Sequence, residues 1–162
     1  MPLLLETPAF APKQRIPDQF TRQGGNVSPR VEWSGAPADT RSFALVVEDP
    51  DAPRGVFRHW AAYDIAPDMQ WLGEGAGSGE LGSPIRQATN DFGNAHYDGP
   101  QPPPGHGTHH YHFRLFALDV DQLDVPDDAT ASQVLEAAIE HSIAEADVVG
   151  TFSRNGTAQN HA

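Results

Sequence analysis

Apolar residues in this chain form short runs that glycine and proline separate, and three of these runs have the pattern of β-strands. Residues 42–48 contain the unbroken apolar stretch 43–47, which is typical of a strand buried on both faces. Residues 56–65 alternate between two faces, one of which carries Phe57, His59, Ala61, Tyr63 and Ile65. Residues 109–118 alternate in the same way, and one face carries His109, Tyr111, Phe113, Leu115 and Ala117.

Helical spacing of apolar residues occurs in the last third of the chain. Thr130 and Gln133 lie three positions apart and predict a capping box at the start of a helix. The buried face of this helix is predicted to comprise Leu135, Ala138, Ile139, Ser142, Ile143 and Ala146. Its outward face is predicted to comprise Glu136, Glu140 and Glu145. Gly150 then either ends the helix or belongs to a short strand at 148–152.

Short strands, many turn residues and one strong helix predict a mainly β protein, a sandwich of antiparallel sheets with a helix in its C-terminal half and short helical turns. The length of 162 residues predicts a single domain, which we place at residues 1–154, followed by a polar tail at 155–162 that we expect to be disordered. The glycine-rich run 73–79 predicts a flexible loop and lacks the Lys-Ser/Thr pair of a phosphate-binding P-loop. Large aromatic side chains predicted in the core or in a pocket wall are Trp33, Trp60 and Trp71.

Charge and cysteine content narrow the classes of function. The chain has 22 acidic and 10 basic residues and a net charge of -12, which argues against binding nucleic acid through a broad surface. It has no cysteine, which excludes disulfides, thiolate nucleophiles and iron–sulfur ligation. The first residues lack the basic segment of a signal peptide, and no apolar stretch approaches the roughly 20 residues of a membrane helix. We therefore expect a cytoplasmic protein without stable membrane attachment.

The first segment with candidate chemistry is 48–53, directly after the buried strand. Pro50 and Pro53 restrict the backbone, so this corner can hold Asp49 rigidly at the end of a strand. The alternative is a turn in which the carboxylates only accept hydrogen bonds from local N–H groups. The Ala52–Pro53 peptide bond is the best candidate in this corner for a cis bond.

The second segment, 94–113, contains five of the eight histidines and a loop rich in glycine and proline. Glycines in this loop, at positions 99, 105 and 107, can leave N–H groups free to donate to a small anion. A metal site is an alternative, but His110 and His112 are predicted on the strand face opposite His109 and Tyr111. A hydrolase triad lacks a recognisable nucleophile. Ordinary surface positions suit His96, His106, His112, His141 and His161.

These residues resemble the two signature blocks of the phosphatidylethanolamine-binding protein family, and most closely its bacterial and archaeal branch, often labelled Raf kinase inhibitor-like. The first block is matched by Asp49-Pro50-Asp51-Ala52-Pro53 and His59-Trp60. The second is matched by Gly99-Pro100-x-Pro102-Pro103 and Gly105-x-Gly107-x-His109-x-Tyr111. Further matching motifs lie at 26–29, 33–35, 90–93 and 145–152, so the resemblance spans nearly the whole chain.

The resemblance implies two packed antiparallel sheets and a small cavity that accepts phosphate or the phosphoryl head group of a lipid. Carried over residue by residue, it assigns ligand binding to Asp49, Ala52, Pro53, His59, Gly99, Pro102, His109 and Tyr111. The family commonly has arginine where this chain has His110, which weakens the metal alternative, and its prokaryotic branch often has cysteine where this chain has Gln101. The C-terminal helix of the eukaryotic members has no counterpart after Arg154.

We therefore expect non-catalytic binding of a small anionic ligand, with no metal and no cofactor. In this hypothesis the Tyr111 hydroxyl, an N–H group of His59 or His109 and loop N–H groups donate to phosphate oxygens, while Asp49 orients an imidazole. One alternative is an interaction protein that modulates a kinase or a protease. Another is a metal- or histidine-dependent hydrolase. A homodimer and a regulated protein partner both remain open at this point.

Overall fold

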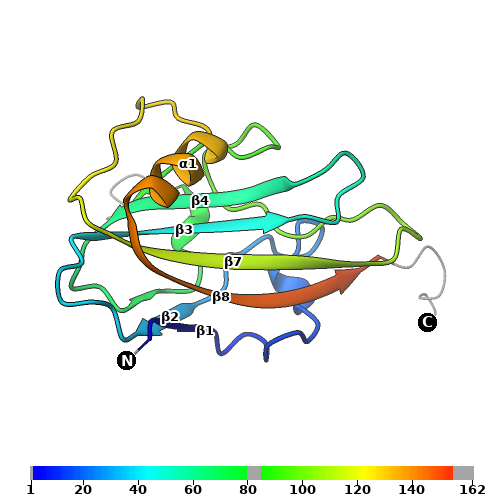
Figure 1. Cartoon of the computed structure of the whole chain (residues 1–162). Helices are drawn as coiled ribbons and strands as arrows, with labels where there is room; N and C mark the ends of the chain where they lie inside the picture. The colour runs from blue at the N-terminus through cyan, green and yellow to red at the C-terminus, as the bar shows by residue number, and fades with distance from the viewer. Residues whose placement is uncertain (1, 80–84, 155–162) are drawn as a thin grey trace.

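The computed structural model describes residues 2–79 and 85–154, and it contains two antiparallel sheets, as predicted. The smaller sheet has the strand order β1-β2-β5 and comprises β1 (Leu4–Glu6), β2 (Val31–Ser34) and β5 (Trp71–Leu72). The larger sheet has the order β6-β4-β3-β7-β8 and comprises β6 (Arg86–Gln87), β4 (Phe57–Ile65), β3 (Ser42–Asp49), β7 (Thr108–Leu118) and β8 (Ser142–Ser153). Figure 1 shows the helix α1 (Ala131–His141) on one side of the larger sheet and β1 and β2 on the other.

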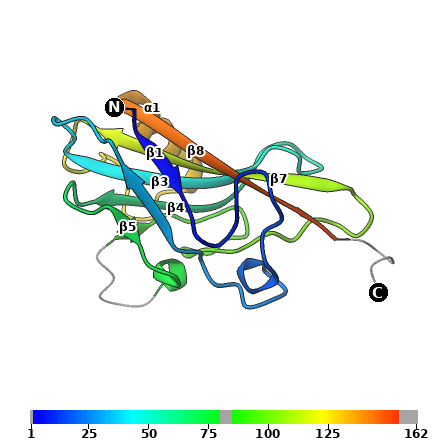
Figure 2. The same cartoon turned by 90° about the horizontal axis from the view of Figure 1, so that it is seen from below.

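Two apolar cores lie on the two faces of the larger sheet. The first core lies between the sheets, and its members include Leu5 and Trp33 from the smaller sheet and Leu45 and Phe113 from the larger. Figure 2 shows β1 crossing the strands of the larger sheet on this side. The second core lies between the larger sheet and α1. Because β3 is central in the sheet and contributes to both cores, all of its residues are buried, which explains its unbroken apolar run.

The predicted alternation of β4 is wrong because two irregularities interrupt it. Val47 pairs with Trp60 and Glu48 with Arg58, so His59 is an extra residue between successive pairs, as in a β-bulge. His59 and Trp60 consequently both face the side of the first core, whereas Ala61 and Tyr63 belong to the second. Asp64 has a positive φ of 55°, and the next residue, Ile65, returns to the first core. By contrast, the predicted face of β7 is correct from Tyr111 to Ala117.

The helix starts where predicted and ends earlier. The capping box is present, with the Thr130 hydroxyl accepting from the Gln133 N–H at 3.2 Å. The helix ends at His141, and β8 then pairs with β7 along its whole length. Ile143 and Ala146 therefore lie on a strand beside the first core, and Ile139 is 54% exposed on the helix. Pairing with a long neighbouring strand overrides the local helical spacing, a nonlocal effect that periodicity does not contain.

Two further sequence predictions need correction, and one falls outside the described residues. Trp33 and Trp60 are buried as predicted, but Trp71 is 51% exposed and lies under the Arg30 guanidinium at 5.2 Å. Within the glycine-rich run, Ala76–Ser78 form a 3₁₀ turn, and Gly77 is buried against Trp60 and Tyr97 instead of lying in a flexible loop. The predicted tail at 155–162 is not among the described residues. In the described part of the chain, no helix is long and apolar enough to cross a membrane.

Candidate functional site

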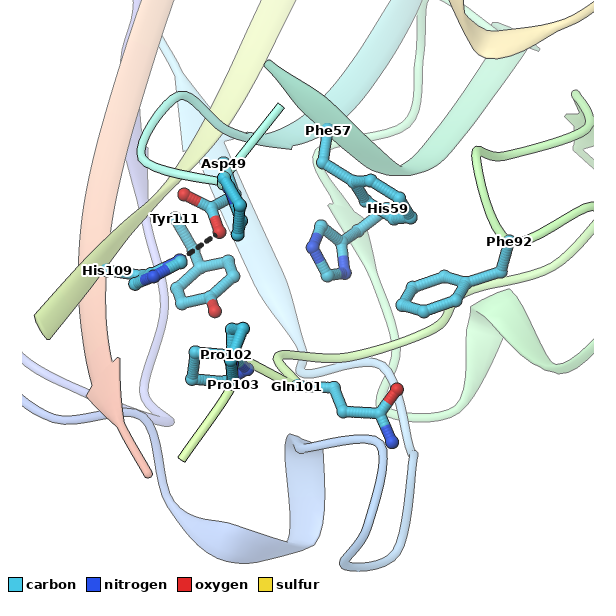
Figure 3. A pocket seen from close by; sticks show the side chains of 10 residues that line it. Asp49, Phe57, His59, Phe92, Gln101, Pro102, Pro103, His109 and Tyr111 are labelled. Atoms are coloured by element: carbon cyan, nitrogen blue, oxygen red, sulfur yellow. Dashed lines mark hydrogen bonds and ion pairs between the residues drawn. The ribbon is translucent and has the colours of Figure 1, made fainter. Parts of the chain in front are cut away.

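A cavity of about 160 Å³ lies at the edge of the larger sheet where β3 ends and β4 and β7 begin. Antiparallel pairing brings these three strand ends together, since Asp49 pairs with Phe57 and Glu48 with His112. The loop before β7 covers the opposite side of the cavity (Figure 3). The residues that line the cavity are Asp49, Pro53, Phe57, His59, Phe92, Gln101, Pro102, Pro103, His109 and Tyr111.

Asp49, His109 and His106 form a chain of hydrogen bonds that leads from the cavity to solvent. Asp49 Oδ2 lies 2.6 Å from His109 Nδ1, and His109 Nε2 lies 2.6 Å from Nδ1 of the exposed His106. Asp49 Oδ1 accepts from the N–H of Asp51 at 2.8 Å. The Asp49 carboxylate thus both accepts from a local N–H group and orients an imidazole. The turn and the rigid site corner, given above as alternatives, are therefore both present. Both ring nitrogens of His109 are engaged, which leaves neither one for a ligand.

His59 is buried and held by the loop backbone. Its Nδ1 lies 2.9 Å from the carbonyl oxygen of Asp98 and 3.1 Å from that of Gly99. Because carbonyl oxygens only accept, Nδ1 carries the proton, and Nε2 of the neutral ring is an acceptor. Burial lowers the pKa of His59 and outweighs the opposing hydrogen bond to Asp98. His59 is therefore neutral at pH 7, and it acquires a second N–H only when it takes up a proton.

The Asp98 side chain anchors the loop that holds His59. Its Oδ1 accepts from Asn26 Nδ2 at 3.0 Å, and its Oδ2 accepts from Asn90 Nδ2 at 2.8 Å and Asn94 Nδ2 at 2.9 Å. Asn90 Nδ2 also donates to the carbonyl oxygen of His59 at 3.0 Å. Burial alone would raise the pKa of Asp98, but these amide donors hold the pKa below its usual value. Asp98 is therefore a buried carboxylate ion that positions His59 through the backbone.

Tyr111 contributes a buried hydroxyl that has no hydrogen-bond partner in the described structure. Its ring packs edge-on against His59, with 5.3 Å between ring centroids, and Figure 3 shows the hydroxyl directed toward the proline-rich loop. Burial raises the pKa of Tyr111, and the nearby Asp49 carboxylate raises it further, so the phenol keeps its proton and remains a donor. A buried hydroxyl without a partner carries a desolvation cost, which an acceptor in the cavity would remove.

The structure brings six of the eight predicted site residues to the cavity; the other two do not line it. Ala52 lies in the turn after β3, where its carbonyl oxygen accepts from the Gly55 N–H at 3.1 Å. Gly99 does not line the cavity: its N–H donates to Asn26 Oδ1 at 2.8 Å and its carbonyl oxygen faces His59.

The N–H of Gly105, a second predicted loop donor, donates to Arg154 O at 2.8 Å. The predicted loop donors at Gly99 and Gly105 are thus wrong, because the protein itself uses them. The Ala52–Pro53 bond is trans, since the described residues contain no cis peptide bond.

Several residues at the cavity were not predicted as site residues. Phe57 lies two positions before His59, and alternation alone already placed both on one face. Phe92 comes from a motif of the family resemblance, and its ring contacts both Phe57 and His59. No motif or spacing near Arg22 in the sequence indicated a role at the site. Its guanidinium nevertheless lies 4.1 Å above the Phe92 ring, and its Nη1 donates to Gln101 Oε1 at 2.9 Å.

The remaining histidines of β7 lie on the other face of the sheet, as predicted. His110 Nδ1 lies 2.8 Å from Asp51 Oδ2, and His112 Nδ1 lies 3.5 Å from Asp147 Oδ2. Within residues 2–79 and 85–154, no three histidine, aspartate or glutamate side chains are grouped closely enough to hold a metal ion. His106 differs from the expected ordinary surface histidine because it contacts His109, and His161 lies outside the described residues.

Comparisons with known proteins agree with the motifs in the chain. The family model described as phosphatidylethanolamine-binding protein matches residues 6–153. A UPF0098 protein of Methanothermobacter thermautotrophicus is 42% identical over 151 residues, which cover 93% of this chain and 98% of that protein. The UPF0098 protein YbhB of Escherichia coli is 37% identical over 145 residues, which cover 88% and 91% of the two chains. The crystal structure of E. coli YbcL, described as a member of the mammalian PEBP family, has a TM-score of 0.88 at 29% identity and covers 94% of this chain and 99% of its own.

Proposed function

The chain belongs to the phosphatidylethanolamine-binding protein family, and from this premise we propose that its cavity binds the phosphoryl group of a small ligand or of a head group without turning it over. The observation that carries the proposal is the Tyr111 hydroxyl, a buried donor at the cavity that is in hydrogen-bonding geometry with no described residue, although the Asp49 carboxylate lies close enough to affect it. A phosphate oxygen is a strong acceptor and would satisfy it.

His59 is the second donor in this proposal. Its Nε2 is an acceptor in the neutral ring and becomes a donor when the ring takes up a proton. A dianionic ligand beside the ring favours the charged form, so phosphoryl binding takes up a proton at His59. His109 is not a ligand donor in this proposal, because its two ring nitrogens already contact Asp49 and His106. It supports the cavity and contributes no donor to the ligand.

The lining supports binding more than attack by an activated hydroxyl or thiol nucleophile. None of the described lining residues is serine, threonine or cysteine, and the rest of the wall is largely aromatic rings and prolines. A volume of about 160 Å³ suits one compact group such as a phosphoryl. Three expectations from the sequence stay predictions: that the protein modulates a kinase or a protease, that it forms a homodimer, and that it is cytoplasmic.

Calorimetric titration of the full chain with inorganic phosphate at pH 6 tests the proposal. Tyr111→Phe removes only the hydroxyl, and we expect it to weaken phosphate binding about tenfold, the loss of one hydrogen bond to a charged group. The control is Tyr63→Phe, a buried tyrosine of the second core that does not line the cavity. Equal phosphate affinity in wild type and Tyr111→Phe, or no phosphate binding at all, would overturn the proposal.

A further inference from the structure

Arg22 contacts two residues of the cavity wall, Phe92 and Gln101. Its backbone N–H donates to the carbonyl oxygen of Pro100 at 3.0 Å, which fixes the start of the side chain beside the loop. Its guanidinium lies 4.1 Å above the Phe92 ring, and its Nη1 donates to Gln101 Oε1 at 2.9 Å. Arg22 itself does not line the cavity, but it contacts two residues that do.

The charge of Arg22 is only loosely paired. Its acidic neighbour is Asp98, and the distance from Arg22 Nε to Asp98 Oδ1 is 3.4 Å, which is long for a charged hydrogen bond. Asp98 needs no arginine for hydrogen bonding, because three asparagine amides already donate to its two oxygens. The Arg22 side chain is 34% exposed, so the cation is accessible without unfolding of the loop.

Most N–H groups of the Arg22 guanidinium have no acceptor among the described residues. A guanidinium has five N–H groups in a planar fork that matches two oxygens of a phosphate. The one short hydrogen bond of Arg22 goes to a neutral amide oxygen, and no described residue pairs with its Nη2. An oxyanion is a stronger acceptor than an amide for this cation, so a ligand oxygen can replace Gln101 Oε1.

We propose that Arg22 forms a second anion subsite of the cavity, which selects small ligands that carry two linked phosphoryl groups. This inference rests on the proposed function: one phosphoryl group binds Tyr111 and His59, and the second displaces the Gln101 amide and binds the Arg22 guanidinium. The arrangement of charges supports this orientation. Figure 3 shows Phe92 and Gln101 on the side of His59 away from Asp49, so the second phosphoryl group lies toward the cation and away from the carboxylate.

The test compares inorganic phosphate with pyrophosphate by calorimetric titration of the full chain, at constant ionic strength and with EDTA present to remove divalent cations. We expect wild type to bind pyrophosphate about tenfold more tightly than phosphate. Arg22→Gln should remove most of this preference and leave phosphate affinity within about twofold. Arg30→Gln is the matched control, since Arg30 also lies over an aromatic ring, at 5.2 Å from Trp71, and does not line the cavity.

A second variant keeps the test independent of how well Arg22→Gln folds. Gln101→Ala removes the amide that occupies Arg22, and we expect the ratio of pyrophosphate affinity to phosphate affinity to rise above that of wild type. Pyrophosphate preference that survives Arg22→Gln, or that falls equally in Arg30→Gln, would overturn the subsite and leave the proposed function standing. Absence of phosphate and pyrophosphate binding in wild type would overturn both.

Discussion

Asp49 and His109 form a hydrogen bond of 2.6 Å between side chains that are only 4% and 2% exposed. The two residues lie 60 positions apart and come from neighbouring strand ends of the larger sheet. Removing one partner of such a pair leaves the other buried without compensation, which costs more than the loss of an exposed pair.

We therefore expect His109→Ala to lower the free energy of unfolding by about 3 kcal/mol, because the Asp49 carboxylate loses its partner. This cost is below the stability of a typical domain, so the variant remains folded at 25 °C. Urea denaturation measures the loss. His110→Ala is the matched control, since its pair with Asp51 has side chains that are 51% and 41% exposed, and we expect a change below about 1 kcal/mol. Equal losses in the two variants would contradict the prediction.

Ligand affinity should rise as the pH falls from 8 to 6. Burial lowers the pKa of His59 in the free protein, and a bound anion favours its protonated form, so binding takes up a proton there. Sulfate is a suitable probe because it is tetrahedral and does not titrate in this range. Titration in two buffers of different ionisation enthalpy measures the proton uptake directly. His59→Gln should abolish the uptake; the same uptake in this variant would assign it to another group.

Stability should fall as the pH decreases below about 6.5, the ordinary pKa of histidine in an unfolded chain. The folded-state pKa of His59 is lower, so the unfolded state binds more protons in this range and gains stability relative to the folded state. The contribution is at most about 1.4 kcal/mol per pH unit. Urea denaturation between pH 7 and pH 5 should show a shallower slope for His59→Gln than for wild type. Identical slopes would show that His59 does not carry this dependence.

Gly99→Ala should be strongly destabilising although Gly99 does not line the cavity. A Cβ atom at this position would lie 2.0 Å from the carbonyl oxygen of Phe20 and 2.9 Å from Thr21 Cα, so backbone must move. We expect a loss of about 2 kcal/mol or more, with weaker phosphate binding because the Gly99 carbonyl oxygen holds His59. Gly73→Ala is the control, since a Cβ there meets nothing within 4 Å and its φ is not positive. Thermal unfolding that shifts equally in both variants would refute the argument.

The sequence predicted the elements that depend on local pattern and missed those that depend on distant partners. The alternation of residues 109–118 placed His109 and Tyr111 correctly, because a strand has a period of two residues. The end of the helix at His141 was missed, since Ile143 and Ala146 fit a helical face as well as a strand paired to β7. Only the neighbouring strand decides between the two.

The same distinction applies to the site. Motifs at strand ends identified Asp49 and His59. They did not predict that the Gly99 N–H donates to Asn26 Oδ1, because Asn26 lies 73 positions earlier. Arg22 escaped prediction for the same reason: nothing near it in sequence indicates that it contacts Gln101, 79 positions later. Such contacts follow from topology, which a single sequence does not display.

The long sequence separation of these contacts also has a consequence for folding. The bond between Asn26 and Asp98 spans 72 positions and that between His59 and Asp98 spans 39, so the cavity requires segments from most of the chain. Contacts of this kind form slowly, because the entropy of closing long loops must be overcome first. In a partly folded chain that lacks these contacts, the cavity is therefore not formed. Ligand binding reports completion of the native topology, and ligand present during refolding stabilises only the final state.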